Sequence, residues 1–348
     1  MLNKPVLAPR AFRRWTSSWP TDLPAKGQRW AGERSPFPGG NVRTTLREGC
    51  DRNSRRRLAC GLHTVGMEVM VLRDAQRFAE LALPWMATDP YSTNVIGVHL
   101  ATTCAGNQPL RGDGIWVAVS EGGEVAGVAM HTPPHNIFLP RLKSGLPSQI
   151  ALALARSGRT LPGVTGEVGS VDEFARTWAR QTGIVSHLSH ALRMYRLDAV
   201  SPPRSVQGQP RQAGRGDRVL LMQWLTQFHA EAVPDSPADD VAELVERRLA
   251  HFETWLWCVD DTPVSLAGCS RPASGLARVG PVYTPAEHRR RGYGASVTAH
   301  ATQAALDGGA AQVVLYTDLA NPTSNAIYQS IGYIPDHDAE ERSFVQGM

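Results

Sequence analysis

The stretch that most constrains this 348-residue chain is a strand, a glycine-containing loop and a helix over residues 276–309. The apolar run LARVGPVYT (276–284) predicts a buried strand, and SVTAHATQAALDGG (296–309) predicts a helix that two glycines end. Gly292 and Gly294 lie between them, where the backbone can curl close to a ligand. The first turn of a helix has N–H groups without partners and a positive partial charge, so this arrangement predicts an anion site in an α/β fold.

The spacing of these glycines excludes two common phosphate loops. A dinucleotide-binding loop needs a third glycine in G-x-G-x-x-G, but Val297 stands at that position. The G-x-x-x-x-G-K-[ST] loop of nucleoside-triphosphate sites is absent from the sequence. Nucleic acid is disfavoured, because the surrounding region is not basic and does not interleave aromatic with basic residues. The pattern that remains is R-x-x-G-x-G, made by Arg289, Gly292 and Gly294.

A second motif lies downstream of this loop. TDLANPTSNAIYQSIGY (317–333) contains Asn321 and Tyr328 seven residues apart, and a glycine follows. Together with R-x-x-G-x-G, on an expected strand–helix–strand–helix pattern, it resembles the GNAT family of acyl-CoA-dependent N-acyltransferases. That family's second signature is N-x-x-A-x-x-x-Y-x-x-x-G-F, in which Ser324 here replaces alanine and Tyr333 replaces phenylalanine.

The resemblance covers residues 217–348 and implies that this part binds acetyl-CoA. The residues that match the family's cofactor-binding positions are Val282, Tyr283, Thr284, Arg289, Arg290, Arg291, Gly292, Tyr293, Gly294, Ala295 and Asn321. It implies that the strand backbone and Asn321 bind pantetheine, while the loop holds the pyrophosphate mostly through N–H groups. It also implies that Tyr328 protonates the departing CoA thiolate as general acid, and that an amide near Tyr283 binds the oxyanion.

The general base is not identified by the motifs. The acceptor amine must lose a proton, so a carboxylate or histidine facing the site is expected. The candidates that stay open are Glu253, His251, Asp318 and Glu287. Arg290 and Arg291 also fit solvated surface charges, and Tyr283 also fits strand packing, so these alternatives stay open as well.

The first half of the chain repeats the order of elements of the second. WVAVSEGGEVAGVAM (116–130) can be laid beside WCVDDTPVSLAGCSR (257–271), since in both an apolar strand and an acidic turn precede a strand with Ala-Gly. ALRMYRLDAV (191–200) predicts a strand that closes the first half. SPPRSVQGQPRQAGRG (201–216) is rich in proline and glycine and predicts a linker.

We therefore expect an α/β fold with two GNAT-like domains, each a mixed central sheet flanked by helices. The first would span residues 67–200, and the catalytic domain 217–348 would follow the 201–216 linker. The first half has no R-x-x-G-x-G, and LPGVTGEVGS (161–170) stands in roughly its place without the basic residue. It resembles a degenerate GNAT-like domain that has lost CoA binding and serves a structural role or walls the acceptor site.

Residues 1–66 differ in composition from the rest. They contain thirteen Lys and Arg against four Asp and Glu, a net charge of +9. The whole chain carries +4, so the remaining residues carry −5. Without a period of 2 or 3.6, this segment predicts a disordered basic extension. Translation from Met67 or Met70, a transit peptide and a nucleic-acid-binding arm stay open as alternatives.

Composition bounds the remaining expectations. The five cysteines form no CxxC pair and no zinc-type cluster, so we expect no metal and reduced thiols in the cytoplasm. No apolar run approaches the roughly 20 residues of a membrane-spanning helix, so no membrane partner is expected. We expect a monomer or homodimer that transfers an acetyl group from acetyl-CoA to an unidentified primary amine by direct attack. A non-catalytic acyl-CoA-binding or scaffold module is the alternative.

Overall fold

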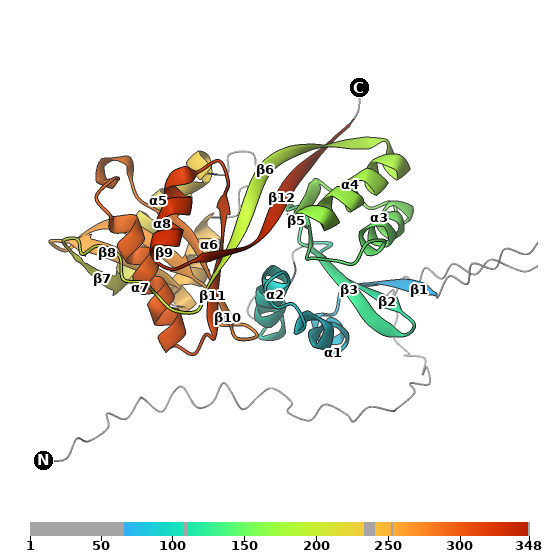
Figure 1. The fold of residues 1–348 in the computed structure, drawn as a ribbon, viewed down its shortest axis with the longest axis horizontal. Coiled ribbons are helices and arrows are strands. Elements are labelled where there is room, and N and C mark those ends of the chain that lie inside the picture. Colours follow the sequence, from blue (N-terminus) through green and yellow to red (C-terminus); the bar gives the residue numbers. More distant parts are fainter. Residues whose placement is uncertain (1–65, 107–109, 111, 233–240, 252, 347–348) are drawn as a thin grey trace, which may run out of the picture. The chain divides into compact units, whose positions relative to one another are not determined.

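The computed structural model describes residues 66–106, 110, 112–232, 241–251 and 253–346. The basic extension expected over residues 1–66 lies outside the described residues, apart from Gly66. From Gly66 on, the described chain alternates helices with strands, as the sequence predicts (Figure 1).

The two halves of the described chain contain the same series of elements. The N-terminal half contains β1 (Met67–Leu72), α1 (Ala75–Met86), α2 (Asn94–Cys104), β2 (Ile115–Glu121), β3 (Glu124–His131), β4 (Ile137–Leu139), α3 (Leu146–Arg156), β5 (Gly163–Glu167), α4 (Val168–Thr182) and β6 (Ile184–Leu197). The C-terminal half contains β7 (Gln209–Gln212), α5 (Arg218–Ala232), α6 (Val241–His251), β8 (Thr254–Val259), β9 (Thr262–Cys269), β10 (Leu276–Tyr283), α7 (Tyr293–Asp307), β11 (Gln312–Asp318), α8 (Pro322–Ser330) and β12 (Ile334–Gln346). Short 3-10 turns precede α5 and α7.

One sheet of the described residues joins both halves. Its strand order is β1-β2-β3-β4-β5-β12-β6-β11-β10-β9-β8-β7 (Figure 1). β7–β12 correspond in turn to β1–β6. The strand order read from the β7 edge is therefore the same as the order read from the β1 edge. The sheet is mixed, because β4–β5 and β10–β11 pair in parallel while the other neighbours are antiparallel. The expectation of two related α/β units with mixed sheets is confirmed.

The last strand of each half crosses into the sheet of the other half. β6 pairs with β11 along Leu192–Leu197, and β12 pairs with β5 along Ala339–Ser343. β6 and β12 also pair with each other over nearly their whole length (Figure 1). The strand that the sequence predicts over residues 191–200 is present as part of β6, but it is longer and pairs with β11 and β12 of the second half. A period of 2 predicts a strand and its faces, but it does not identify the partner strand.

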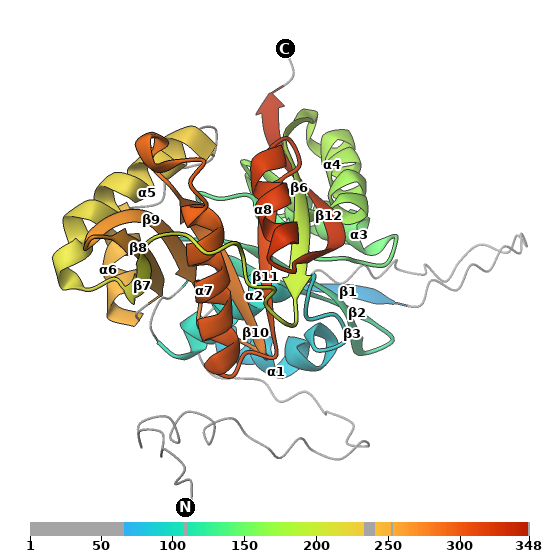
Figure 2. The same cartoon turned by 60° about the vertical axis from the view of Figure 1, so that its left-hand side comes forward.

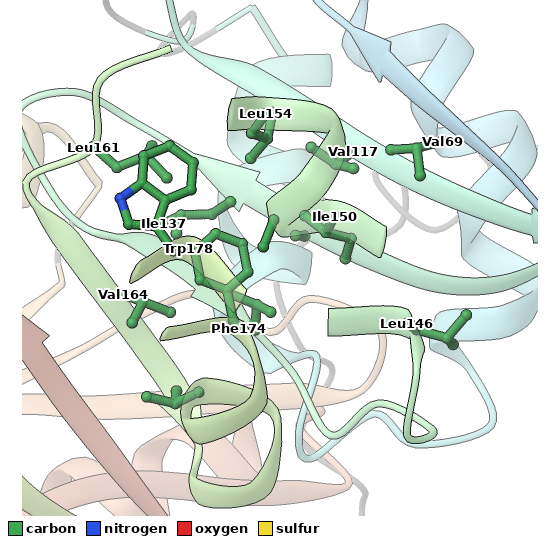
Figure 3. Packing of buried hydrophobic residues seen from close by; sticks show 14 of the residues in the cluster. Val69, Val117, Ile137, Leu146, Ile150, Leu154, Leu161, Val164, Phe174 and Trp178 are labelled. Carbon is green, nitrogen blue, oxygen red and sulfur yellow. The ribbon is translucent and has the colours of Figure 1, made fainter. Parts of the chain in front are cut away.

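Helices cover both faces of the N-terminal part of the sheet. On one face, Ile150 of α3, Trp178 of α4 and Val117 of β2 belong to one apolar cluster, which Figure 3 shows. On the other face, Phe78 of α1 stacks on Trp116 with ring centroids 5.0 Å apart. Trp116 and Val117 are both fully buried, which is why β2 reads as a continuous apolar run rather than an alternating one.

The C-terminal part of the sheet is covered in the same way. Leu266 of β9 packs with Trp224 under α5 and α6, on what we call the α5 face. Ala267, its neighbour, packs with Val297 under α7 and α8, on what we call the α7 face. In Figure 2, α7 and α8 lie in front of β10 and β11. The candidate site lies between these two faces, where β10 and β11 separate.

Part of the expected linker is ordered against the C-terminal half. β7 pairs with the edge of β8, and Trp257 Nε1 donates to Gln207 O at 3.0 Å. Gly208 has a φ of +108°, and a Cβ there would lie 2.4 Å from Cys258 O, so only glycine fits. The edge position of β7 also explains why it tolerates Pro210, which has no N–H to donate.

The strand exchange predicts that residues 201–348 do not fold alone. Removal of β6 leaves Val313–Asp318 of β11 without a partner along that edge, and it removes Tyr195 and Leu197 from the apolar cluster on the α7 face. We expect this fragment to aggregate in size-exclusion chromatography, to lack a cooperative thermal transition, and to become soluble when residues 67–200 are co-expressed. The full chain is the control. A monomeric 201–348 fragment that unfolds cooperatively would contradict the exchange.

Candidate active site

β10 and β11 separate partway along their length. They pair only over Leu276–Arg278, whereas β10 continues to Tyr283 beside β9 and β11 continues to Asp318 beside β6. A bulge in β10 accompanies this change of direction. The backbone of Val282–Thr284 therefore has no partner in β11, and an extended ligand can supply the missing hydrogen bonds.

Arg289 holds the loop between β10 and α7 in place. Its Nε donates to Thr284 O at 2.8 Å, and its guanidinium pairs with Glu231 of α5 at 2.5 Å. It also lies 5.8 Å from the ring centroid of Tyr283, whose hydroxyl donates to Glu231 at 2.9 Å. The hydrogen bond from Arg289 holds the pKa of Glu231 below its usual range. Arg289 is thus engaged within the protein, where it orients the loop.

Gly292 and Gly294 are required for different physical reasons. Gly292 has a φ of +86°, which other residues rarely adopt, and a Cβ there would lie 2.8 Å from Cγ1 of Val206. A Cβ on Gly294 would lie 3.3 Å from Thr284 Oγ1, because the start of α7 passes close to the end of β10. The loop therefore has little room for side chains and favours contacts through its backbone.

The N-terminus of α7 has no side-chain cap. Asp74 caps α1, Glu167 caps α4 and Asn321 caps α8, whereas α2 begins without a side-chain cap, as α7 does. Arg290 and Arg291 beside α7 are exposed, and neither has an ion-pair partner among the described residues. Uncapped N–H groups, the helix dipole and two unpaired cations make this terminus a favourable position for an anion.

The side chains of several matched residues belong to the protein core. Tyr293 and Tyr283 are buried, and Tyr283 packs edge-on against Trp224 with ring centroids 6.3 Å apart. Val282 and Ala295 contact the apolar cluster on the α7 face. The Tyr283 side chain therefore packs in the core, which is one of the two roles that the sequence leaves open. These four residues offer mainly their backbone to a ligand.

Asn321 and Tyr328 belong to α8 and its cap. Asn321 Oδ1 accepts from Ser324 N at 3.0 Å. Tyr328 is 9% exposed, packs edge-on against Tyr333 and hydrogen-bonds to Ser324. Burial raises the pKa of Tyr328 to about 12, so the hydroxyl keeps its proton at neutral pH. Tyr328 and Val282 contact the same apolar cluster, so the two sequence motifs meet on the α7 face.

Asn325 is a residue of this region that the sequence motifs miss. Its Nδ2 donates to Asp318 O at 2.8 Å and to Asn321 O at 2.7 Å, which ties α8 to the end of β11. Its Oδ1 accepts from the hydroxyl of Tyr195 on β6 at 3.0 Å. The repeated asparagine in NPTSN is the signal in the sequence, but its partner lies in the other half of the chain and could not be found from spacing.

Of the candidate bases, Glu253 and His251 lie near the α5 face. Arg248 of α6 donates to Glu253 O at 3.3 Å and to Gly280 O of β10 at 2.8 Å. Glu253 is therefore held close to the point where β10 leaves β11. His251 ends α6, two residues earlier.

The other two candidates lie elsewhere. Asp318 ends β11, and its carboxylate accepts from Ala320 N at 2.7 Å, so it closes a turn. Glu287 is exposed in the 3-10 turn before α7. Among the four, Glu253 is the residue whose backbone is tied to Arg248, which also binds β10, and its charge acts on that arginine.

In the N-terminal half, the counterpart of α7 is α3, and a carboxylate of the protein lies at its N-terminus. Glu173 of α4 accepts from Gly145 N at 3.0 Å, from Ser148 N at 3.2 Å and from Ser148 Oγ at 2.7 Å. The sequence places LPGVTGEVGS (161–170) at this position, and this is wrong, because those residues form β5 and the start of α4. The equivalent loop is residues 140–145.

The described residues contain no group of three or more His, Cys, Asp and Glu side chains placed to hold a metal ion. In the same part of the chain, no helix is long and apolar enough to cross a membrane. The cysteines within it, Cys104, Cys258 and Cys269, are free thiols.

Residues 218–333 match the model of the acetyltransferase (GNAT) family. This part of the chain is therefore a domain of that family, as its two motifs indicate, and its fold supports acyl transfer in general. No curated protein matches the chain.

Three solved structures share the fold over both halves. A GNAT-family acetyltransferase from Colwellia psychrerythraea is 10% identical with a TM-score of 0.52, over 80% of this chain and 99% of its own. A Drosophila protein is 12% identical with a TM-score of 0.58, also over 80% and 99%. A GCN5-related N-acetyltransferase from Sphaerobacter thermophilus is 14% identical with a TM-score of 0.51, over 79% and 95%. At these identities the likeness shows the fold alone.

The carboxylate at α3 predicts a pH-dependent contribution to stability. Burial alone would raise the pKa of Glu173, but hydrogen bonds from Ser148, Gly145 and Ser144 outweigh it and lower the pKa. The stabilisation is therefore present above the ordinary pKa of 4.5 and is lost as the pH falls below it. We expect Glu173→Gln to lower the free energy of unfolding by roughly 1–3 kcal/mol at pH 7. Urea unfolding should show the difference from the unmodified chain shrinking towards pH 3.

Glu124→Gln is the matched control, because Glu124 is exposed in a hairpin turn. This variant should unfold like the unmodified chain at every pH. If Glu173→Gln behaves like Glu124→Gln, the carboxylate does not stabilise the α3 terminus.

Proposed function

We propose that this chain is an N-acyltransferase that moves an acetyl group from acetyl-CoA to a primary amine. The observation that carries the proposal is the uncapped, glycine-bounded N-terminus of α7 beside the separated strands β10 and β11. The amine attacks the thioester directly, so no covalent intermediate forms on the enzyme. The GNAT fold supports acyl transfer in general. The proposal adds acetyl-CoA as the donor and a primary amine as the acceptor.

The donor is held by backbone groups more than by side chains. The amides of Gly292–Ala295 and the side chains of Arg290 and Arg291 bind the pyrophosphate. The backbone of Val282–Thr284 forms hydrogen bonds with the amides of pantetheine, which takes the place of a neighbouring strand. Asn321 also binds pantetheine. Two observations support this placement: α7 begins without a side-chain cap, and this part of β10 has no partner in β11.

Proton transfers at the nitrogen and the sulfur complete the reaction. Glu253 takes a proton from the ammonium form of the acceptor, directly or through a water molecule, so that the neutral amine attacks. Tyr328 donates its proton to the CoA sulfur as the carbon–sulfur bond breaks, and its raised pKa keeps that proton available. The second proton that the nitrogen loses as the amide forms restores Tyr328 through solvent. A β10 amide near Tyr283 stabilises the oxyanion of the tetrahedral intermediate.

The two halves differ in their capacity for CoA. Glu173 fills the anion position of the N-terminal half, so we expect one acetyl-CoA per chain. The N-terminal half then supports the active half through β6 and walls the acceptor side. We propose a cytoplasmic enzyme, monomeric or homodimeric, that needs no metal.

Replacing Tyr328 tests catalysis. Tyr328→Phe removes the proton but keeps the ring against Tyr333, so we expect kcat to fall by about 100-fold or more with little change in acetyl-CoA affinity. Thiol release with a panel of amines measures the rate, and calorimetry measures the affinity. An unchanged kcat would remove Tyr328 from the acid role. Acetyl-CoA binding without thiol release by the unmodified chain would favour the alternative of a non-catalytic binding module.

Replacing Gly292 tests the donor site. Gly292→Asp adds a carboxylate and a Cβ where the φ is +86°, so acetyl-CoA affinity should fall at least about tenfold in calorimetry. Gly158→Asp is the control for the strain of a positive φ and for the added charge. Gly158 has a positive φ too, but it lies in the N-terminal half and has open space around it. Equal loss of affinity in both variants, or none in Gly292→Asp, would contradict a pyrophosphate site at α7.

A further inference from the structure

Arg278 places a guanidinium on the α5 face where β10 leaves β11. It is the last residue of β10 that pairs with β11, opposite Val314. Its neighbours Ala277 and Val279 pack on the α7 face, so its side chain projects to the opposite side of the sheet. There its guanidinium carbon lies 5.4 Å from the ring centroid of Tyr316. An acceptor that approaches the separated strands from the α5 face therefore meets Arg278.

Arg278 has no carboxylate partner among the described residues. Burial lowers its pKa, and only the nearby Tyr316 opposes that shift. A second cation, Arg248, is near enough for Arg278 to act on its pKa. Burial lowers the pKa of Arg248 to about 10, Glu253 opposes this shift, and Arg247 and Arg278 add to it. Arg278 is half-buried. A cation that is partly withdrawn from water is normally paired, so the charge of Arg278 is in excess at this place.

Two other arginines on this side of the sheet have carboxylate partners. The pairs are Arg141–Asp89 at 2.9 Å and Arg196–Asp336 at 3.6 Å. Asp89 and Asp336 are the carboxylates whose charge reaches Tyr316, and both are already engaged. Arg278 therefore stays without a counter-ion although carboxylates lie nearby.

Asn94 adds a second group without a partner at the same place. This residue begins α2, which lies beside the ends of β10 and β11 in Figure 1 and Figure 2, and its Nδ2 donates to the Tyr316 hydroxyl at 3.2 Å. Asn94 is 5% exposed, and its Oδ1 is buried without a hydrogen-bond donor. An unmade hydrogen bond of this kind is costly. Tyr316 is thus flanked by an unpaired cation and an unpaired acceptor.

We infer that Arg278 binds a carboxylate of the acceptor, so that the substrate is a primary amine carrying a nearby carboxylate, as in an amino acid. The inference rests on the proposed function, which supplies the donor on the α7 face. One unpaired guanidinium suits a monoanion, and its planar fork matches the two oxygens of a carboxylate. Asn94 Oδ1 accepts an N–H of the same molecule. Arg278 orients the acceptor, and no bond changes at it.

Matched pairs of amines test this inference. The panel contains amino acids and the amines left when their carboxyl group is removed, such as lysine with cadaverine, phenylalanine with phenethylamine and tryptophan with tryptamine. We expect the best amino acid to exceed its carboxyl-free partner roughly tenfold to a hundredfold in kcat/KM. The release of the CoA thiol from acetyl-CoA measures kcat/KM for each amino acid and for its carboxyl-free partner.

Variants then assign the preference to Arg278. Arg278→Gln should abolish the preference for the carboxylate, so that the ratio of kcat/KM between each amino acid and its carboxyl-free amine falls to about one. Arg278→Lys keeps the charge without the fork and should restore part of the preference. Arg271→Gln, at an exposed arginine of the same hairpin, is the control and should keep the full preference. A thermal unfolding curve for each variant verifies that it is folded.

Failure of this inference is distinguishable from failure of the proposed function. Binding of N-acetyl amino acids and of the matching N-acetyl amines in the presence of CoA, measured by calorimetry, needs no turnover. Tighter binding of the carboxylates that Arg278→Gln removes supports the inference even if no amine is acetylated. Equal binding of the paired compounds, no binding of the carboxylates, or a preference that Arg278→Gln keeps would overturn it.

Discussion

The reciprocal pairing of β6 with β11 and of β12 with β5 is the constraint on which the rest of the structure depends. Because β6 holds β11 along its whole length, β10 can leave β11 after three paired residues without opening the sheet elsewhere. The hydroxyl of Tyr195 on β6 also binds Asn325, which fixes α8 and therefore Tyr328. The N-terminal half thus supports the candidate site through hydrogen bonds, although its own motif is lost.

The two halves differ most at the start of one helix. In α3 the N–H groups and Ser148 bind Glu173, so this anion position is satisfied from within the protein. In α7 the same position has no cap and is flanked by Arg290 and Arg291. Both termini offer an anion the same N–H groups and helix dipole, but only that of α3 is occupied by a side chain of the protein. Under the proposed function, Glu173 leaves the chain with a single donor site.

Sequence patterns predict the elements of this fold better than their partners. The hairpins β2–β3 and β8–β9, the strand and helix around Gly292, and the family of residues 218–333 follow from local motifs and are confirmed. The exchange of β6 and β12 could not be predicted, because a period of 2 carries no information about which strand lies alongside. Glu173 and Asn325 were missed for a related reason, since their partners are distant in sequence. The roles of Tyr328 and of the loop residues stay predictions.

The central claim is that α7 carries the donor site and that α3 cannot. A crystal structure of the chain with CoA tests it most directly. The account predicts density for the pyrophosphate at the backbone N–H groups of Gly292–Ala295, pantetheine beside Val282–Thr284, and Glu173 unmoved at the start of α3. Pyrophosphate density at α3, or CoA bound away from both helices, would contradict the account.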